Sequence, residues 1–223
     1  MPIMNRMTMR ILITIILLSI GFTAWSQDLK RYFFVPDAEH IDMVTVGFCV
    51  TDKGKLIPDE VVKEQSNYRG KVGLDLLATY LEEFRYAPDS KYNGSCWRAV
   101  FRFVNEKYLD ASLSEEDCAY TKRFKEGTFY YQNYKPDEVV VERYGNFQKE
   151  YDSEYGQYFD VIWDSDCAYT MVFTKMEDKE LQHLVGKEIY VEIIGIIDEN
   201  TYIYKSDTNF KDAVDYGVMV KKQ

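Results

Sequence analysis

Residues 44–62 read VTVGFCVTDKGKLIPDEVV, and this stretch decides the fold of the first half of the chain. Apolar residues alternate in its first part, which predicts a strand over His40–Thr51. The turn Asp52–Lys55 contains a glycine, which adopts the positive φ that a tight hairpin needs. A second strand follows over Lys55–Glu64. Pro58 places it at a sheet edge or a bulge, because proline has no N–H to donate.

The spacing of the apolar residues changes after this hairpin. Over Val72–Phe84, leucine and aromatic residues recur along one side of a helix. Alternation returns over Ser95–Asn105, where one face of the strand carries Trp97, Ala99, Phe101 and Phe103. We therefore expect an α+β fold in this half. Three antiparallel strands would form the sheet and one helix would cover its apolar face, in the chain order ββαβ.

The four cysteines suggest two disulfides. If the helix carries the chain back across the sheet, the end of the first strand meets the start of the third, which brings Cys49 near Cys96. Cys118 and Cys167 each begin the tetrapeptide Cys-Ala-Tyr-Thr, so they are expected to join two strand starts. Four cysteines allow three pairings, and reduced cysteines or bonds between the two halves are the alternatives.

The N-terminus has the pattern of a secretory signal peptide. Arg6 and Arg10 precede the apolar run Ile11–Trp25, and small residues stand three and one positions before Gln27. The run is shorter than the about 20 apolar residues of a membrane-spanning helix, although an uncleaved anchor is the alternative. We expect residues 1–26 to be removed, leaving a periplasmic or extracellular protein with no membrane span.

The second half contains strands and tight turns. Consecutive strands with short connections predict an all-β antiparallel meander, which stays open or closes into a small barrel. The polar segment Asp110–Asp117 reads as a linker, and the charge changes across it. There are 12 basic and 14 acidic residues from Asp28 to Ser112, against 13 and 23 afterwards. We expect two domains, residues 27–112 and 113–223.

Several motifs of the first domain resemble the C-terminal domain of the TonB energy transducer. They are the hairpin sequence of residues 44–62, the leucine-rich helix, FRYAP at residues 84–88 and WRAVFRFV at residues 97–104. The resemblance covers about residues 38–108. It implies a transport-associated module that binds an extended peptide of an envelope protein as an added strand at the sheet edge.

The third strand is the expected binding edge, because Pro58 removes a donor from the second strand and because this family pairs with partners through its last strand. The expected contact residues are Trp97, Val100, Phe101 and Phe103. The second half resembles a family of short secreted bacterial proteins of unassigned function. The shared motifs are Cys-x₅-Phe-x₂-Gly-x-Phe at residues 118–129 and Trp-x₃-Cys-x-Tyr at residues 163–169.

Composition and motifs exclude several classes of function. With 27 basic and 37 acidic residues, the net charge of −10 argues against nucleic acid as a partner, since that binding relies on Lys and Arg. Two histidines leave little from which to build a metal site or a hydrolase relay. No nucleophile elbow, phosphate-binding loop or dinucleotide fingerprint is present. We predict a non-enzymatic binding protein with no catalytic residue, metal or cofactor.

Tyrosine is the compositional oddity of the second half, which holds 13 of the 19. Those near its first strands are Tyr130, Tyr131, Tyr134, Tyr144, Tyr151, Tyr155 and Tyr158. Tyrosine is favoured in binding surfaces, but it also suits half-buried strands. Two other functions therefore stay open: a lipocalin-like carrier of a small apolar or aromatic ligand in the second domain, and a structural envelope protein without a ligand.

Overall fold

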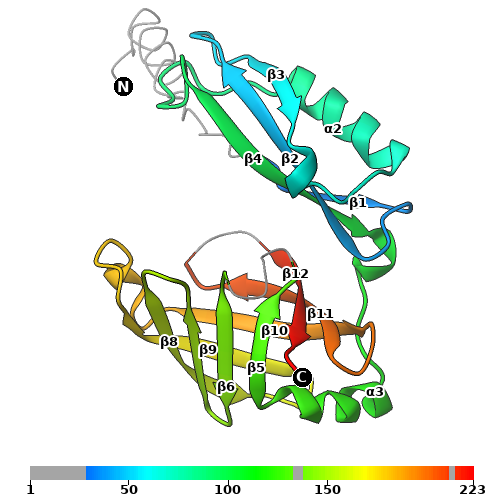
Figure 1. Cartoon of the computed structure of the whole chain (residues 1–223), viewed down its shortest axis with the longest axis vertical. Coiled ribbons are helices and arrows are strands. Elements are labelled where there is room, and N and C mark those ends of the chain that lie inside the picture. Colours follow the sequence, from blue (N-terminus) through cyan, green and yellow to red (C-terminus); the bar gives the residue numbers. More distant parts are fainter. Residues whose placement is uncertain (1–28, 133–137, 211–213) are drawn as a thin grey trace, which may run out of the picture.

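The computed structural model describes residues 29–132, 138–210 and 214–223. The expected signal peptide (residues 1–26) and Tyr134 lie outside these ranges. Within them, no helix combines the length and hydropathy that crossing a bilayer requires. Figure 1 shows a sheet with one covering helix, and below it a barrel.

The sheet has four strands in the order β1-β4-β2-β3. Their bounds are Tyr32–Val35 for β1, Ile41–Val50 for β2, Leu56–Val61 for β3 and Cys96–Asn105 for β4. β2 is antiparallel to both β3 and β4, whereas β1 runs parallel to β4 along Arg102–Asn105. The sheet is therefore mixed, and its outer strands are β1 and β3.

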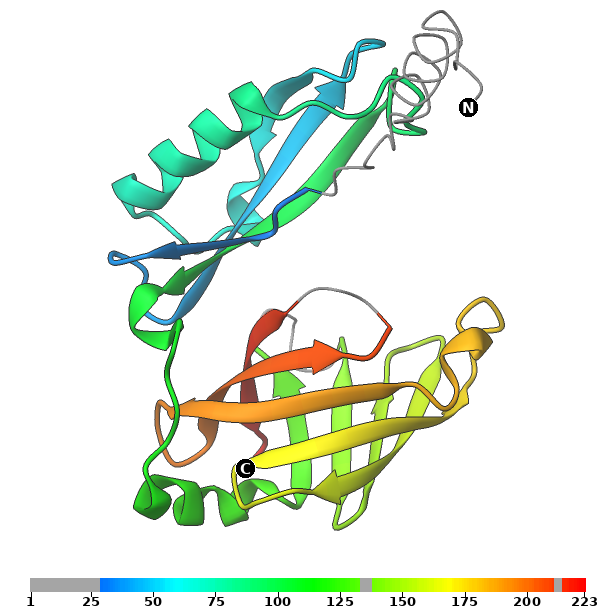
Figure 2. The same ribbon diagram turned by 180° about the vertical axis from the view of Figure 1, so that it is seen from behind.

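The barrel contains eight antiparallel strands and is closed, because β12 pairs with β5. The strands are β5 (Gly127–Tyr131), β6 (Val140–Tyr144), β7 (Phe147–Tyr151), β8 (Gly156–Trp163), β9 (Ala168–Met176), β10 (Glu188–Ile196), β11 (Thr201–Thr208) and β12 (Asp215–Lys221). The short helix α3 (Glu115–Tyr120) and the 3₁₀ turn Thr121–Phe124 lie at one end, as Figure 2 shows from behind.

The predicted fold class, α+β with a three-stranded ββαβ sheet followed by an all-β antiparallel meander or small barrel, is wrong. Of the described residues, 47% lie in strands and 17% in helices, and they combine a mixed four-stranded sheet with a closed barrel. The four residues of β1 are too few to show the alternation of apolar and polar residues that identifies a strand, so β1 could not be recognised from the sequence. The barrel closes because its first and last strands pair with each other. These strands are far apart in the sequence, so the alternation of residues within each strand does not predict their pairing.

Helix α2 (Lys71–Glu83) covers one face of the sheet, and distant residues cap its N-terminus. Gly70 offers no capping side chain, but the Asp37 carboxylate accepts the Val72 N–H at 3.0 Å. The Tyr68 hydroxyl accepts the Gly73 N–H at 2.9 Å and donates to Asp37 at 2.5 Å. This last hydrogen bond lowers the pKa of Asp37. The caps satisfy backbone donors that a helix start leaves unpaired and so fix α2 on the sheet.

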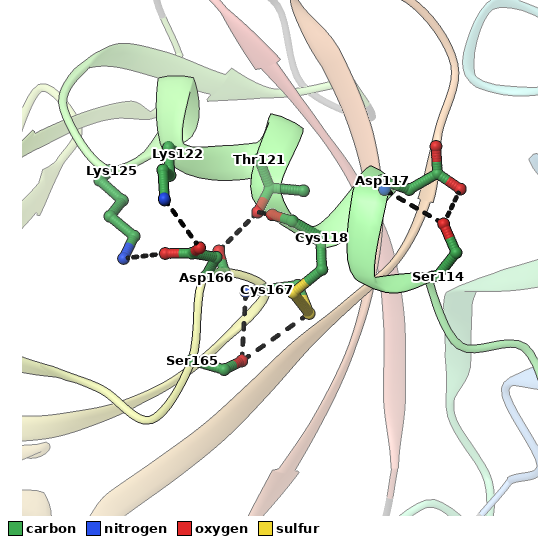
Figure 3. The surroundings of a disulfide bond; sticks show 9 residues. All are labelled: Ser114, Asp117, Cys118, Thr121, Lys122, Lys125, Ser165, Asp166 and Cys167. Atoms are coloured by element: carbon green, nitrogen blue, oxygen red, sulfur yellow. Dashed lines mark hydrogen bonds and ion pairs between the residues drawn. A yellow bond between two sulfur atoms is a disulfide. The ribbon is translucent and has the colours of Figure 1, made fainter.

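Both expected cysteine pairs are bonded in the structure. Cys49 and Cys96 face each other on β2 and β4, on the side of the sheet away from α2. The Cys118–Cys167 disulfide joins α3 to the loop before β9 (Figure 3). Beside it, the Asp166 carboxylate forms ion pairs with Lys125 at 2.9 Å and with Lys122 at 3.3 Å. These links fasten α3 over the barrel end.

The second face of the sheet packs against the outside of the barrel through an apolar cluster. Its buried members are Ile41 and Val104 from the sheet, Tyr108 from the following turn, and Ile194, Ile203 and Val218 from the barrel. Gly195 allows the close approach, since a Cβ there would lie 3.0 Å from the Tyr108 ring. This cluster holds the sheet and the barrel together.

His40 makes this contact sensitive to pH. Its Nδ1 lies 2.8 Å from the Tyr108 hydroxyl, and burial lowers the pKa of His40, with Lys107 lowering it further against the opposing charges of Glu39 and Asp42. The folded protein thus favours the neutral ring. The resulting stability is full above the ordinary histidine pKa of about 6.5 and is lost as the pH falls through the lower folded-state pKa.

We therefore expect wild-type protein to lose stability relative to the His40→Gln variant on acidification. Urea unfolding of both proteins between about pH 8 and about pH 5 measures this difference, because titration of shared carboxylates cancels. Parallel pH profiles for the two proteins would contradict it.

Candidate binding groove

An apolar groove lies between β3 and α2. It has a volume of about 630 Å³. Val44 and Val46 of β2 form its floor, Val61 of β3 forms one wall, and Leu74 and Leu77 of α2 form the other. The groove exists because the helix axis leaves the edge of the sheet partly uncovered, while the β2 side chains beneath remain buried.

The walls of the groove expose large apolar side chains. Val61 is 48% exposed, Leu74 36% and, at the edge, Ile57 51%. Single exposed apolar residues are ordinary, but a contiguous set around a hollow marks an interaction site. At the rim, Lys55 and Glu82 supply one charge of each sign.

β3 borders the groove with an open strand edge. In the described part of the chain, β3 pairs only with β2, and the isolated bridge from Lys55 to Arg85 lies just before it. Pro58 lies in the middle of β3, where it offers a carbonyl but no N–H. An added strand would therefore pair along this edge with one donor fewer than usual.

Of the four residues expected to contact a peptide, two are buried and two are accessible. Phe101 and Phe103 are fully buried beneath α2, and Phe103 pairs with Phe33 of β1. Trp97 is 41% exposed and Val100 is half-buried, on the part of β4 that precedes the pairing with β1. Only Trp97 and Val100 thus lie where a partner has access. The edge of β4 itself is occupied from Arg102 to Asn105.

Sequence reasoning missed the groove residues. The available signal was the pair Ile57 and Val61, two apolar residues at exposed positions of a strand. Leu74, one of the leucines on the predicted apolar side of the helix, is also partly exposed. In the described ranges, no three His, Cys, Asp or Glu side chains are placed to hold a metal ion. No family model, curated protein or solved structure matches the chain.

Proposed function

We propose that residues 27–112 form a TonB-C-like module that binds an extended segment of an envelope protein by strand addition, with the added strand lying along β3. The observation that carries this proposal is the apolar groove beside an open strand edge. Main-chain hydrogen bonds to β3 would supply affinity. Alternate side chains of the added strand would enter the groove and supply selectivity.

The proposed compartment is the periplasm or the cell exterior. The two disulfides support it, because such bonds persist in oxidising environments and are rare in the cytosol. The carrier function has no comparable support, since buried side chains such as Phe129, Val141 and Arg143 pack together inside the barrel.

Selection from a displayed library of random decapeptides, followed by fluorescence anisotropy of the enriched peptides, tests the groove. We expect enriched peptides with apolar residues at alternate positions. Leu74→Glu should weaken their binding at least about tenfold, because it places a charge in an apolar contact. Leu74 is exposed, so the fold should tolerate this change.

Ile162→Glu is the matched control, because Ile162 is an exposed apolar residue on the barrel. The Ile162→Glu variant should bind the peptides with the same affinity as the wild type. Equal binding by the Leu74→Glu variant, or enrichment of peptides without an apolar pattern, would refute the proposal.

A further inference from the structure

The two disulfides differ in how far they are open to solvent. Cys96 is exposed and Cys49 is half-buried, whereas Cys118 and Cys167 are both half-buried. Cys167 packs against an apolar cluster of the barrel, and its bond lies between α3 and the loop before β9 (Figure 3). In the described part of the chain, neither Cys49 nor Cys96 packs in such a cluster. The Cys49–Cys96 bond is therefore the more accessible of the two.

A hollow of about 290 Å³ lies beside the Cys49–Cys96 bond. Gly47 and Arg98, which face each other across β2 and β4, line this hollow next to the two cysteines. Gly47 has no side chain to fill the space, and the Arg98 guanidinium is held to the side by its ion pair with Glu60 at 3.0 Å. The rate of thiol–disulfide exchange depends on access of the attacking thiolate to one sulfur, and the hollow provides that access.

The Cys49–Cys96 bond closes a loop that contains both walls of the groove. The two cysteines are 47 residues apart, and the segment between them carries β3 and α2. A cross-link stabilises a fold by restricting the unfolded chain, and a long loop gains more than a short one. Opening this bond would therefore weaken the attachment of β3 and α2, while the barrel keeps its own disulfide.

Backbone hydrogen bonds hold the strands together next to the Cys49–Cys96 bond. The Val50 N–H donates to the Ser95 carbonyl at 2.8 Å, and the Gly94 N–H donates to the Val50 carbonyl at 2.9 Å. From there β2 and β4 stay paired as far as Ile41 and Val104. Opening the bond does not separate these strands, so the two thiols remain opposite each other and can be reoxidised.

We propose that Cys49–Cys96 is a regulatory disulfide that a dithiol protein of the Cys-x-x-Cys class reduces, while Cys118–Cys167 stays oxidised. The reduced state has a less firmly held segment between residues 50 and 95. The inference does not require peptide binding in the groove, and either proposal can fail without the other.

The exchange takes two steps. One thiolate of the dithiol attacks the exposed Cys96 Sγ, the S–S bond breaks, and its electron pair leaves on Cys49 Sγ, which takes up a proton. The second thiolate of the dithiol then attacks the dithiol's own sulfur in the mixed disulfide and releases Cys96 Sγ, which is also protonated. The chain gains two electrons and two protons, and the dithiol is oxidised to a disulfide.

Incubation of the folded mature chain with reduced thioredoxin, followed by rapid alkylation and peptide mass spectrometry, tests the site of reduction. We expect Cys49 and Cys96 to be labelled at least about tenfold faster than Cys118 and Cys167, which serve as the control within the same molecule. Equal rates for the two bonds, faster opening of Cys118–Cys167, or no reduction of Cys49–Cys96 would overturn the inference.

Amide hydrogen exchange tests the consequence of opening the bond. In the double variant Cys49→Ser, Cys96→Ser, exchange should be at least about fivefold faster within residues 50–95 and unchanged in the barrel. The double variant Cys118→Ser, Cys167→Ser is the matched control and should leave residues 50–95 at wild-type rates. Circular dichroism checks that both variants are folded, and the same measurement on the thioredoxin-reduced wild type needs no substitution. Unchanged exchange within residues 50–95 in the reduced protein would rule out a regulatory role.

Discussion

Replacing Arg143 with methionine is expected to destabilise the barrel by about 3–5 kcal/mol. Arg143 lies inside the barrel with no exposed surface. It donates to Gln148 Oε1 at 2.6 Å, to the Tyr169 hydroxyl at 2.8 Å and to the Phe124 carbonyl at 2.9 Å. Methionine fills much of the same volume, so the loss comes from buried polar groups left without partners.

The surroundings of Arg143 keep it charged. Burial alone would lower the pKa of the guanidinium, but the interactions with Tyr169, Tyr202 and Tyr131 together outweigh burial, so the pKa is raised. The guanidinium also lies 4.6 Å from the ring centroid of Tyr169 and 5.1 Å from that of Phe129. Through Gln148 the network reaches Glu150, whose pKa is raised by burial against the hydrogen bonds from Tyr131 and Gln148. A cation is thus a structural part of this core.

Urea unfolding monitored by circular dichroism measures the effect. Arg123→Met is the matched control, because Arg123 is exposed at the barrel end and stacks on Tyr120, and it should cost less than about 1 kcal/mol. Equal stability of the two arginine variants would show that the network does not hold the barrel.

Arg143 also illustrates what the sequence does not reveal. In Val140–Tyr144, Val141 and Arg143 lie on the same face of the strand, and both point into the barrel. An arginine at an inward position breaks the apolar alternation from which core positions are recognised. Its partners come from segments up to 59 residues away, so no local sequence pattern predicts this hydrogen-bond network.

Other features could be predicted because they depend on neighbouring residues. The alternation around Val44 and Val46 locates β2, and the leucine spacing locates α2. The partnership of Cys49 with Cys96 follows once the helix is taken to return the chain across the sheet. The groove could not be found in this way, because whether Leu74 is buried depends on how far α2 covers β3, and that depends on the packing of the whole layer.

Phe103→Ala is expected to destabilise the sheet by about 3–5 kcal/mol. Phe103 is fully buried, its ring stacks on Tyr68 at 4.0 Å and on Phe33 at 5.7 Å, and its truncation leaves a cavity under the start of α2. Because Tyr68 also caps α2, loosening its ring weakens the helix attachment as well. Trp97→Ala, by contrast, removes a side chain that is 41% exposed and should cost less than about 1 kcal/mol.

Both aromatic residues lie on β4, and both were expected to contact a peptide. Comparing the two variants therefore distinguishes a residue that packs in the core from one that lies at the surface. Urea unfolding should rank the Phe103→Ala variant far below the Trp97→Ala variant in stability. Comparable losses in the two would mean that the Phe103 ring does not anchor the helix to the sheet. For peptides selected on the wild-type protein, folded Trp97→Ala protein should retain full affinity. If it does not, the partner contacts β4 as well as or instead of the groove, since Trp97 of β4 is not among the residues that line the groove.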